Sequence, residues 1–187
     1  MIHSVKFKAV LDTNVIFPIV IRDLLFWFAY YELYTPKWSA TIFEEWKDVM
    51  IRKGLTSDEA NKRTQRANMA FPDALVTNYE RLIDSLELPD VKDRHVLAAA
   101  IKSNANVIVT NNLKDFPKEY LNSFGVKAKS ADDFLTDIID LNPEIAIKAF
   151  KEMVLNRKNP KMDEFEVLES LRKIGLHDTA NYIHTLI

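Results

Sequence analysis

Short apolar runs alternate with longer amphipathic stretches in the chain up to about residue 141. The short runs are typical of buried parallel strands and lie at residues 7–11, 33–35, 107–110 and 126–128. Apolar positions at helical spacing predict helices at residues 19–30, 39–52, 57–70, 93–103 and 130–140. Residues 79–88 are ambiguous and fit a helix followed by a short extended piece. The alternation predicts an α/β fold, a three-layer sandwich around a central, mainly parallel sheet.

Start and stop signals support these boundaries. Pro18 suits the first turn of a helix, and Ser39 suits the N-cap of the next one. Gly54 is typical of a helix end, and Ser130 is a second predicted N-cap. Pro36 is expected to stop the second strand.

The chain changes character near residues 141–143. Beyond this point the pattern is purely helical, and it predicts helices at residues 144–155, 163–174 and 177–186. We therefore expect two units, residues 1–141 and a small helical extension at residues 142–187. The extension has seven basic and seven acidic residues, which argues against a dominant role in nucleic-acid binding. It suits packing or contact with a partner.

Composition narrows the location and the chemistry. The formal net charge of −2 gives no global basic field, so a nucleic acid must meet a local patch. The absence of cysteine excludes disulfides, thiol catalysis and thiolate metal sites. The first seven residues lack the apolar core of a signal peptide, and the longest apolar stretch is broken by Pro18, Arg22 and Asp23. These features predict a cytoplasmic protein without a membrane span.

Acidic residues follow the predicted strands or begin a helix beside them. Asp12 ends the first strand, Asp115 follows the strand at 107–110, and Asp93 begins an apolar helix. Glu45, or its neighbour Glu44, lies on the helix at 39–52. A parallel sheet gathers such residues in the crevice at the carboxyl ends of its strands. Gathered carboxylates repel one another, so the pattern implies a bound hard cation and metal-assisted phosphodiester hydrolysis.

Each acid also has a plainer explanation. Asp12 could be an ordinary turn residue that accepts backbone hydrogen bonds, and a Glu pair on a helix is usually solvated. Asp93 could be only an N-cap, with Asp90 as a second candidate for the site. His95 is attractive as a base, although a single histidine on a helix is more often structural.

Polar residues close in sequence to Asp12 and Asp115 support the assignment of these two acids to a site. Thr13 and Asn14 follow Asp12 and are suited to hold its carboxylate or a bound water. The loop after the strand at 107–110 offers the Thr110 hydroxyl and the Asn112 amide before Asp115. We expect these four side chains to support the acids.

The order of these motifs resembles a PIN domain, the small metal-dependent nuclease fold of VapC-type toxins. The matching pieces are residues 10–14, residues 39–45, residues 93–100, and the strand at 107–110 followed by Asp115-Phe116. The resemblance covers about residues 7–140, and its first and last motifs are quite specific together. It implies a PIN-like sandwich that carries the helical extension.

The resemblance implies a ligand set for Mg²⁺ or Mn²⁺. By position, the family's four acids fall on Asp12, Glu45, Asp93 and Asp115, and the spacing from Ser39 favours Glu45 over Glu44. Many PIN domains have an aspartate where this chain has Asn112, so a second metal site is weakened. The implied activity is endonucleolytic hydrolysis of single-stranded or loop RNA. A VapC-type toxin also implies a small antitoxin as partner, and a homodimer is conceivable.

Local basic and aromatic residues are the candidate contacts for these partners. The basic candidates for RNA binding are Arg52, Lys53, Arg63, Arg66 and Arg94, which could equally be solvated helix faces. The aromatic residues Trp27, Tyr30, Tyr31, Trp38 and Trp46 could anchor a partner or belong to the core.

Two other functions remain open from the sequence. The first is a PIN nuclease of RNA processing or decay that is not a toxin. The second is a non-catalytic PIN-like module that binds RNA or protein, which Asn112 makes conceivable. A receiver-like phosphoacceptor is weaker, because Asp12 has no second acid beside it.

Overall fold

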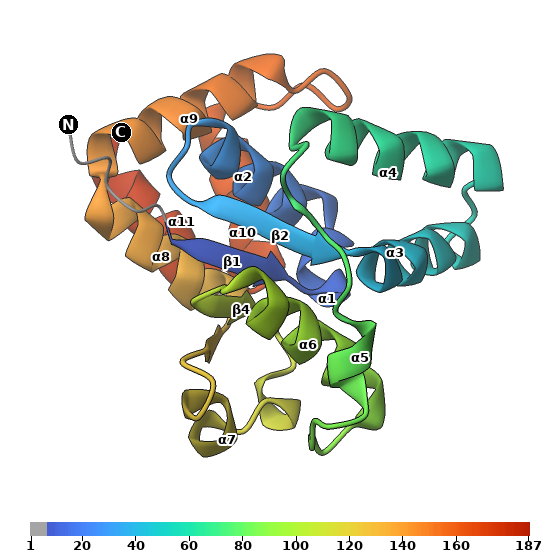
Figure 1. Cartoon of the computed structure of the whole chain (residues 1–187). Coiled ribbons are helices and arrows are strands. Elements are labelled where there is room, and N and C mark those ends of the chain that lie inside the picture. Colours follow the sequence, from blue (N-terminus) through green and yellow to red (C-terminus); the bar gives the residue numbers. More distant parts are fainter. Residues whose placement is uncertain (1–6) are drawn as a thin grey trace.

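The computed structural model describes residues 7–187, and in that range the strands form one five-stranded sheet in the order β3-β2-β1-β4-β5 (Figure 1). All neighbouring strands are parallel. The strands are β1 (Lys8–Leu11), β2 (Thr35–Ser39), β3 (Leu75–Val76), β4 (Val107–Val109) and β5 (Lys127–Lys129). The predicted α/β class is confirmed. The expectation that no signal peptide is present rests largely on residues 1–6, which lie outside the described residues.

Strand β2 corrects the prediction that Pro36 stops the second strand. The strand begins at Thr35 and continues through Pro36 to Ser39, with Pro36 opposite Ala9 of β1. The amide of Thr35 donates to Phe7 of the β1 segment, whereas the amide of Trp38 donates to the β3 side. Successive residues of a strand point their amides to alternate sides, so the N–H that Pro36 lacks would point toward β3. Pairing with β3 begins only at Trp38, and the proline therefore costs the sheet no hydrogen bond there.

The short edge strands were the least predictable parts of the sheet. Strand β3 was missed, because two residues show no periodicity. Strand β5 lies one residue later than predicted. The ambiguous segment at 79–88 contains a single helical turn, α5 (Glu80–Ile83), followed by irregular chain.

The five predicted helices around the sheet lie close to their predicted positions, as α2 (Ile19–Tyr30), α3 (Ala40–Arg52), α4 (Ser57–Ala70), α6 (Arg94–Ser103) and α8 (Ala131–Leu141). The short helices α1 (Thr13–Ile16) and α7 (Lys118–Asn122) were not predicted. Two 3₁₀ turns, η1 (Val91–Asp93) and η2 (Leu113–Asp115), precede α6 and α7. Ser39 and Ser130 cap α3 and α8 as predicted, through backbone amides at 3.2 and 3.0 Å. Helix α4 is capped by Thr56, whose capping box with Glu59 includes a bond of 2.9 Å.

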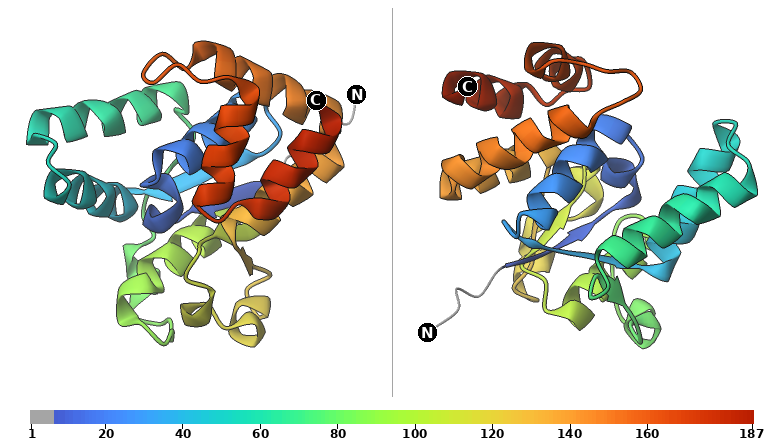
Figure 2. Two further views of the ribbon diagram at one scale, coloured as in Figure 1. Left: turned by 180° about the vertical axis from the view of Figure 1, so that it is seen from behind. Right: turned by 90° about the horizontal axis from the view of Figure 1, so that it is seen from above.

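The core lies on both faces of the sheet. Residues 9–11 and 107–109 of the two central strands are buried, and α6 packs on one face (Figure 2). Helix α2 packs on the other face, and the C-terminal helices lie outside it, against α2 and α8. Among the aromatic residues, Trp38 and Trp46 belong to the core, whereas Tyr30 lies on the surface. No helix in residues 7–187 is long and apolar enough to pass through a bilayer.

The C-terminal segment packs closely on the rest of the chain. It forms α9 (Pro143–Asn156), α10 (Glu164–Lys173) and α11 (His177–Leu186). Helix α9 packs against α2, and α11 packs against α8. The Asp132 carboxylate of α8 accepts hydrogen bonds from the amides of Asp178 and Thr179, at 3.0 and 2.8 Å, and so caps α11. The division into two units at residue 141 stays a prediction.

Candidate active site

Asp12 is held at the carboxyl end of β1 by three hydrogen bonds, which together engage both of its carboxylate oxygens. Its side chain is buried, with 5% exposed. One oxygen accepts from the Thr13 amide at 2.7 Å. The other accepts from the Asn14 amide group at 2.6 Å and from the Thr110 hydroxyl at 2.8 Å. Burial raises the pKa of Asp12, although the hydrogen bonds from Thr110 and Thr13 oppose this effect.

Thr110 joins the two central strands at this edge. Strands β1 and β4 are neighbours, so residues far apart in sequence meet where both strands end. The Thr110 hydroxyl lies 2.9 Å from the Asn14 amide group and accepts the Asn112 backbone amide at 3.1 Å. Asn14 in turn accepts the Asn111 amide at 2.9 Å. The polar loop after β4 is therefore tied to the loop after β1.

Glu45 of α3 lies on the other side of Thr13 from Asp12 and contacts His95 of α6. One carboxylate oxygen accepts the Thr13 hydroxyl at 2.7 Å, and the other lies 2.9 Å from Nε2 of His95. Its neighbour Glu44 instead pairs with Lys47 on the outer face of α3. Partial burial alone raises the pKa of Glu45, but the hydrogen bonds from His95 and Thr13 outweigh it and leave the pKa below its usual value. The geometry supports the choice of Glu45 over Glu44.

Asp93 and Asp115 face each other across Asn112. The Asn112 amide donates to Asp93 at 3.3 Å and also to Asp115. Asp93 occupies the N-cap position of α6, yet within residues 7–187 its side chain makes no capping hydrogen bond. Capping therefore does not explain this aspartate, and its carboxylate is available to the site.

Asp90 completes a carboxylate cluster with Asp93 and Asp115. One oxygen from each of the three lies within 4.8 Å of the other two. Asp90 also caps the turn η1 through the Lys92 amide at 2.9 Å. Burial and the negative charges of Asp12, Asp90 and Asp115 raise the pKa of Asp93 to about 6. At neutral pH the cluster is a site of strong negative potential.

The structure brings the four predicted acids and the four supporting side chains into one connected network. Sequence reasoning left Asp90 and His95 out of the predicted set. Their signals were their positions, three residues before and two residues after Asp93. Nδ1 of His95 is buried and finds no hydrogen-bond partner among the described residues.

This donor set fits a hard divalent cation. It presents the carboxylate oxygens of Asp90, Asp93 and Asp115, and Mg²⁺ and Mn²⁺ prefer such hard oxygen ligands over soft ones. Burial and the repulsion from neighbouring carboxylates raise the pKa of Asp93, and a bound cation would offset both effects.

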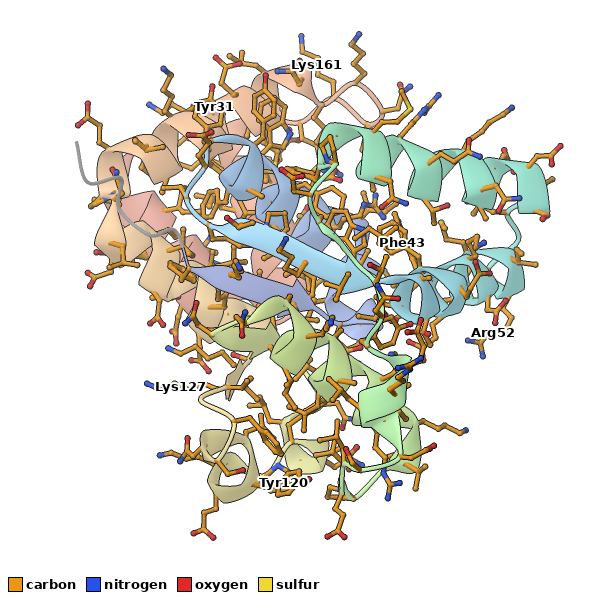
Figure 3. The ribbon with its side chains drawn as sticks, in the orientation of Figure 1. Tyr31, Phe43, Arg52, Tyr120, Lys127 and Lys161 are labelled. Atoms are coloured by element: carbon orange, nitrogen blue, oxygen red, sulfur yellow. The ribbon has the colours of Figure 1, made fainter. Side chains whose placement is uncertain are left out.

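The predicted basic residues do not form one patch. Arg63 and Arg66 of α4 line a groove beside α2. Arg52 and Lys53 lie exposed at the end of α3, where Figure 3 shows Arg52 at the edge of the molecule. Arg94, at the start of α6, is partly buried.

Comparison with known families defines the class of protein. Residues 8–114 match the PIN domain family, so the chain belongs to it, and the family predicted from the sequence is confirmed. Residues 131–185 match a second family, the VapC50 C-terminal domain.

One curated relative is the protein described as "Putative ribonuclease VapC50" from Mycobacterium tuberculosis. The two chains are 38% identical over 109 residues, which is 56% of this chain and 64% of the relative. The chain thus matches slightly less than two thirds of the length of that relative. No solved structure matches the chain.

Proposed function

We propose that this protein is a metal-dependent endoribonuclease and the toxin of a type II toxin–antitoxin pair. The supporting observation is the network that joins Asp12, Glu45, Asp93 and Asp115 at the carboxyl edge of a PIN-domain sheet. The similarity to "Putative ribonuclease VapC50" favours RNA over other phosphodiesters.

Asp12, Glu45, Asp93 and Asp115 are the proposed metal ligands. When bound, Mg²⁺ or Mn²⁺ lowers the pKa of water and stabilises negative charge on a phosphate. Asn112 and Thr110 keep the carboxylates of Asp93 and Asp12 in place. At the start of α1, the Thr13 hydroxyl holds the Glu45 carboxylate and the Asn14 amide group holds that of Asp12.

Glu45 has a different environment from the aspartates. Its side chain is 40% exposed, and hydrogen bonds to both oxygens favour its ionised form. His95 and Thr13 fix its position. We infer that Glu45 supplies a permanent negative charge facing the aspartates.

The proposed partners are an RNA substrate and a small antitoxin protein, with a homodimer as a further possibility. A toxin role predicts that induced expression of the chain stops growth and that an Asp12→Asn variant does not. Normal growth with an active nuclease would instead favour a role in RNA processing.

The direct test is cleavage of total cellular RNA by the purified full chain with Mg²⁺ or Mn²⁺. We expect discrete cuts that disappear with EDTA and with Asp12→Asn. Glu44→Gln is a matched control for Glu45→Gln, because the two residues are adjacent and only Glu45 faces the site. No cleavage by a folded wild-type chain would favour the non-catalytic module, and cuts that persist in Asp12→Asn would refute the site.

A further inference from the structure

A groove of about 510 Å³ lies between α2 and α4, beside α3. Its side chains recur at intervals of three or four residues, so they belong to one face of each helix. The residues that define it are Ile19, Arg22, Phe26, Trp46, Arg63 and Arg66. Figure 3 shows helices α3 and α4, which carry the Trp46, Arg63 and Arg66 side chains of the groove.

The groove carries an excess of positive charge. The Arg22 side chain is 12% exposed and lies over the Trp46 ring, 5.3 Å from its centroid. It pairs with Asp23 at 3.5 Å, and Asp23 also pairs with Arg157 at 3.8 Å. Burial lowers the pKa of Arg22, the charge of Asp23 opposes this effect, and the nearby charge of Arg63 adds to it. With Asp23 shared between two arginines, the groove is suited to an anion.

The groove and the acidic site share helix α3, because Trp46 of the groove follows Glu45 of the site. A second link runs through α1. Arg22 donates to the carbonyl of Ile16 at 3.4 Å, and Ile16 ends the short helix that Thr13 begins. On the proposed function, an RNA strand with a phosphate at the acids would continue toward this positive surface.

Aromatic rings extend the groove away from the site. A second hollow of about 250 Å³ shares Phe26 with the groove and is also lined by Trp27, Tyr30 and Phe71. Tyr30 is 67% exposed. From Ile19 to Tyr30 the helix is about 16 Å long, since each residue rises 1.5 Å. Positive charge followed by exposed rings is how proteins bind single-stranded nucleic acid, through phosphates and stacked bases.

We propose that this groove binds the single-stranded segment of RNA that flanks the cleaved phosphodiester. Arg22, Arg63 and Arg66 contact its phosphates, and the hollow at Tyr30 stacks its bases. The proposal rests on the proposed ribonuclease function. An acidic protein segment could use the arginines, but the exposed Tyr30 ring and the partly buried rings around it favour RNA.

The test measures binding of a fluorescently labelled oligouridylate to the full chain across a salt series. Asp12→Asn serves as the background, so that the RNA stays intact. Arg63→Gln with Arg66→Gln is expected to weaken binding and to reduce the slope of log K against log salt by about 0.7 for each arginine. The matched control is Lys62→Gln, on the same exposed helix but outside the groove, which should leave the slope unchanged.

Tyr30→Ala separates stacking from charge. It should weaken binding by at least about 5-fold without changing the salt slope. If the double variant Arg63→Gln/Arg66→Gln shows the same salt slope as Lys62→Gln while the wild-type chain cleaves RNA, the groove proposal is wrong. An acidic protein partner then becomes the better occupant. If the background variant binds no oligouridylate and the wild type cleaves no RNA, the proposed function itself fails.

Discussion

The carboxylate cluster predicts that the metal-free protein loses stability as pH rises. Asp93 has a pKa of about 6 in the folded chain because of burial and the charges of Asp12, Asp90 and Asp115. An unfolded aspartate has a pKa of about 3.9, so the folded state binds more protons between these values. The free energy of unfolding should therefore fall as pH rises from about 4 to about 6, and then level off.

The size of this effect follows from the shift. A shift of about 2 pKa units corresponds to nearly 3 kcal/mol, and solvent screening of the half-exposed carboxylate reduces it to about 1–2 kcal/mol. Asp93→Asn removes the repulsion, so this variant should be more stable than the wild type at pH 8 in EDTA. The expected rise in melting temperature is about 2–8 °C. At pH 4 the two proteins should melt at similar temperatures.

The assay is thermal unfolding from pH 4 to 8 in EDTA, followed by the same series with Mg²⁺. Asp48→Asn is the control, because Asp48 lies exposed on the outer face of α3. Mg²⁺ should stabilise the wild type at pH 8 and have little effect on Asp93→Asn. An Asp93→Asn variant no more stable than the wild type at pH 8 would contradict the argument, because the acids would then not repel one another.

Three further changes test other contacts. Asp132→Ala removes the cap of α11 and should lower the free energy of unfolding, measured in urea, by about 1–2 kcal/mol. The comparison is Asp137→Ala on the same helix, which removes only a surface ion pair with Lys129, and an equal change in both variants would refute the cap. Thr13→Val should lower the rate of RNA cleavage, whereas Thr13→Ser should retain it, because the hydroxyl donates a hydrogen bond to Glu45. Equal rates in the two variants would show that this hydrogen bond does not contribute to cleavage. Asn112→Asp adds a fourth carboxylate to the cluster of Asp90, Asp93 and Asp115, so calorimetry should find tighter Mn²⁺ binding than in the wild type. Weaker binding would show that the Asn112 amide is needed to position the aspartates.

The sequence predicted the parts of the site that depend on strand order. Asp12 and Thr110 follow apolar runs that are recognisable as buried strands, and adjacent parallel strands end at the same edge. Their contact at 2.8 Å is a direct result of that arrangement. The predicted positions of Asp93 and Asp115 depended more on the resemblance to PIN domains, because neither residue lies in a strand.

Other parts depend on orientation, which local pattern does not contain. His95 meets Glu45 only because α3 and α6 approach each other at that point. Pro36 can stay in β2 because its missing N–H would point toward β3, which pairs with β2 only from Trp38 onward. The sequence alone does not show which neighbouring strand lies on that side. Arg22 seemed to be only a charge that interrupts an apolar stretch, whereas the fold places it over Trp46 beside the site.

The contacts of the C-terminal segment also decide how its role can be tested. Helix α9 packs against α2, the helix that forms one side of the groove, and Arg157 pairs with Asp23 next to Arg22. Deleting residues 143–187 would uncover the buried face of α2, so lost activity could reflect lost folding alone. Arg157→Gln removes the charge at the C-cap of α9 and keeps the packing. If the segment supports the groove, this variant should weaken RNA binding while the melting temperature changes little, because freeing Asp23 leaves more negative charge beside Arg22.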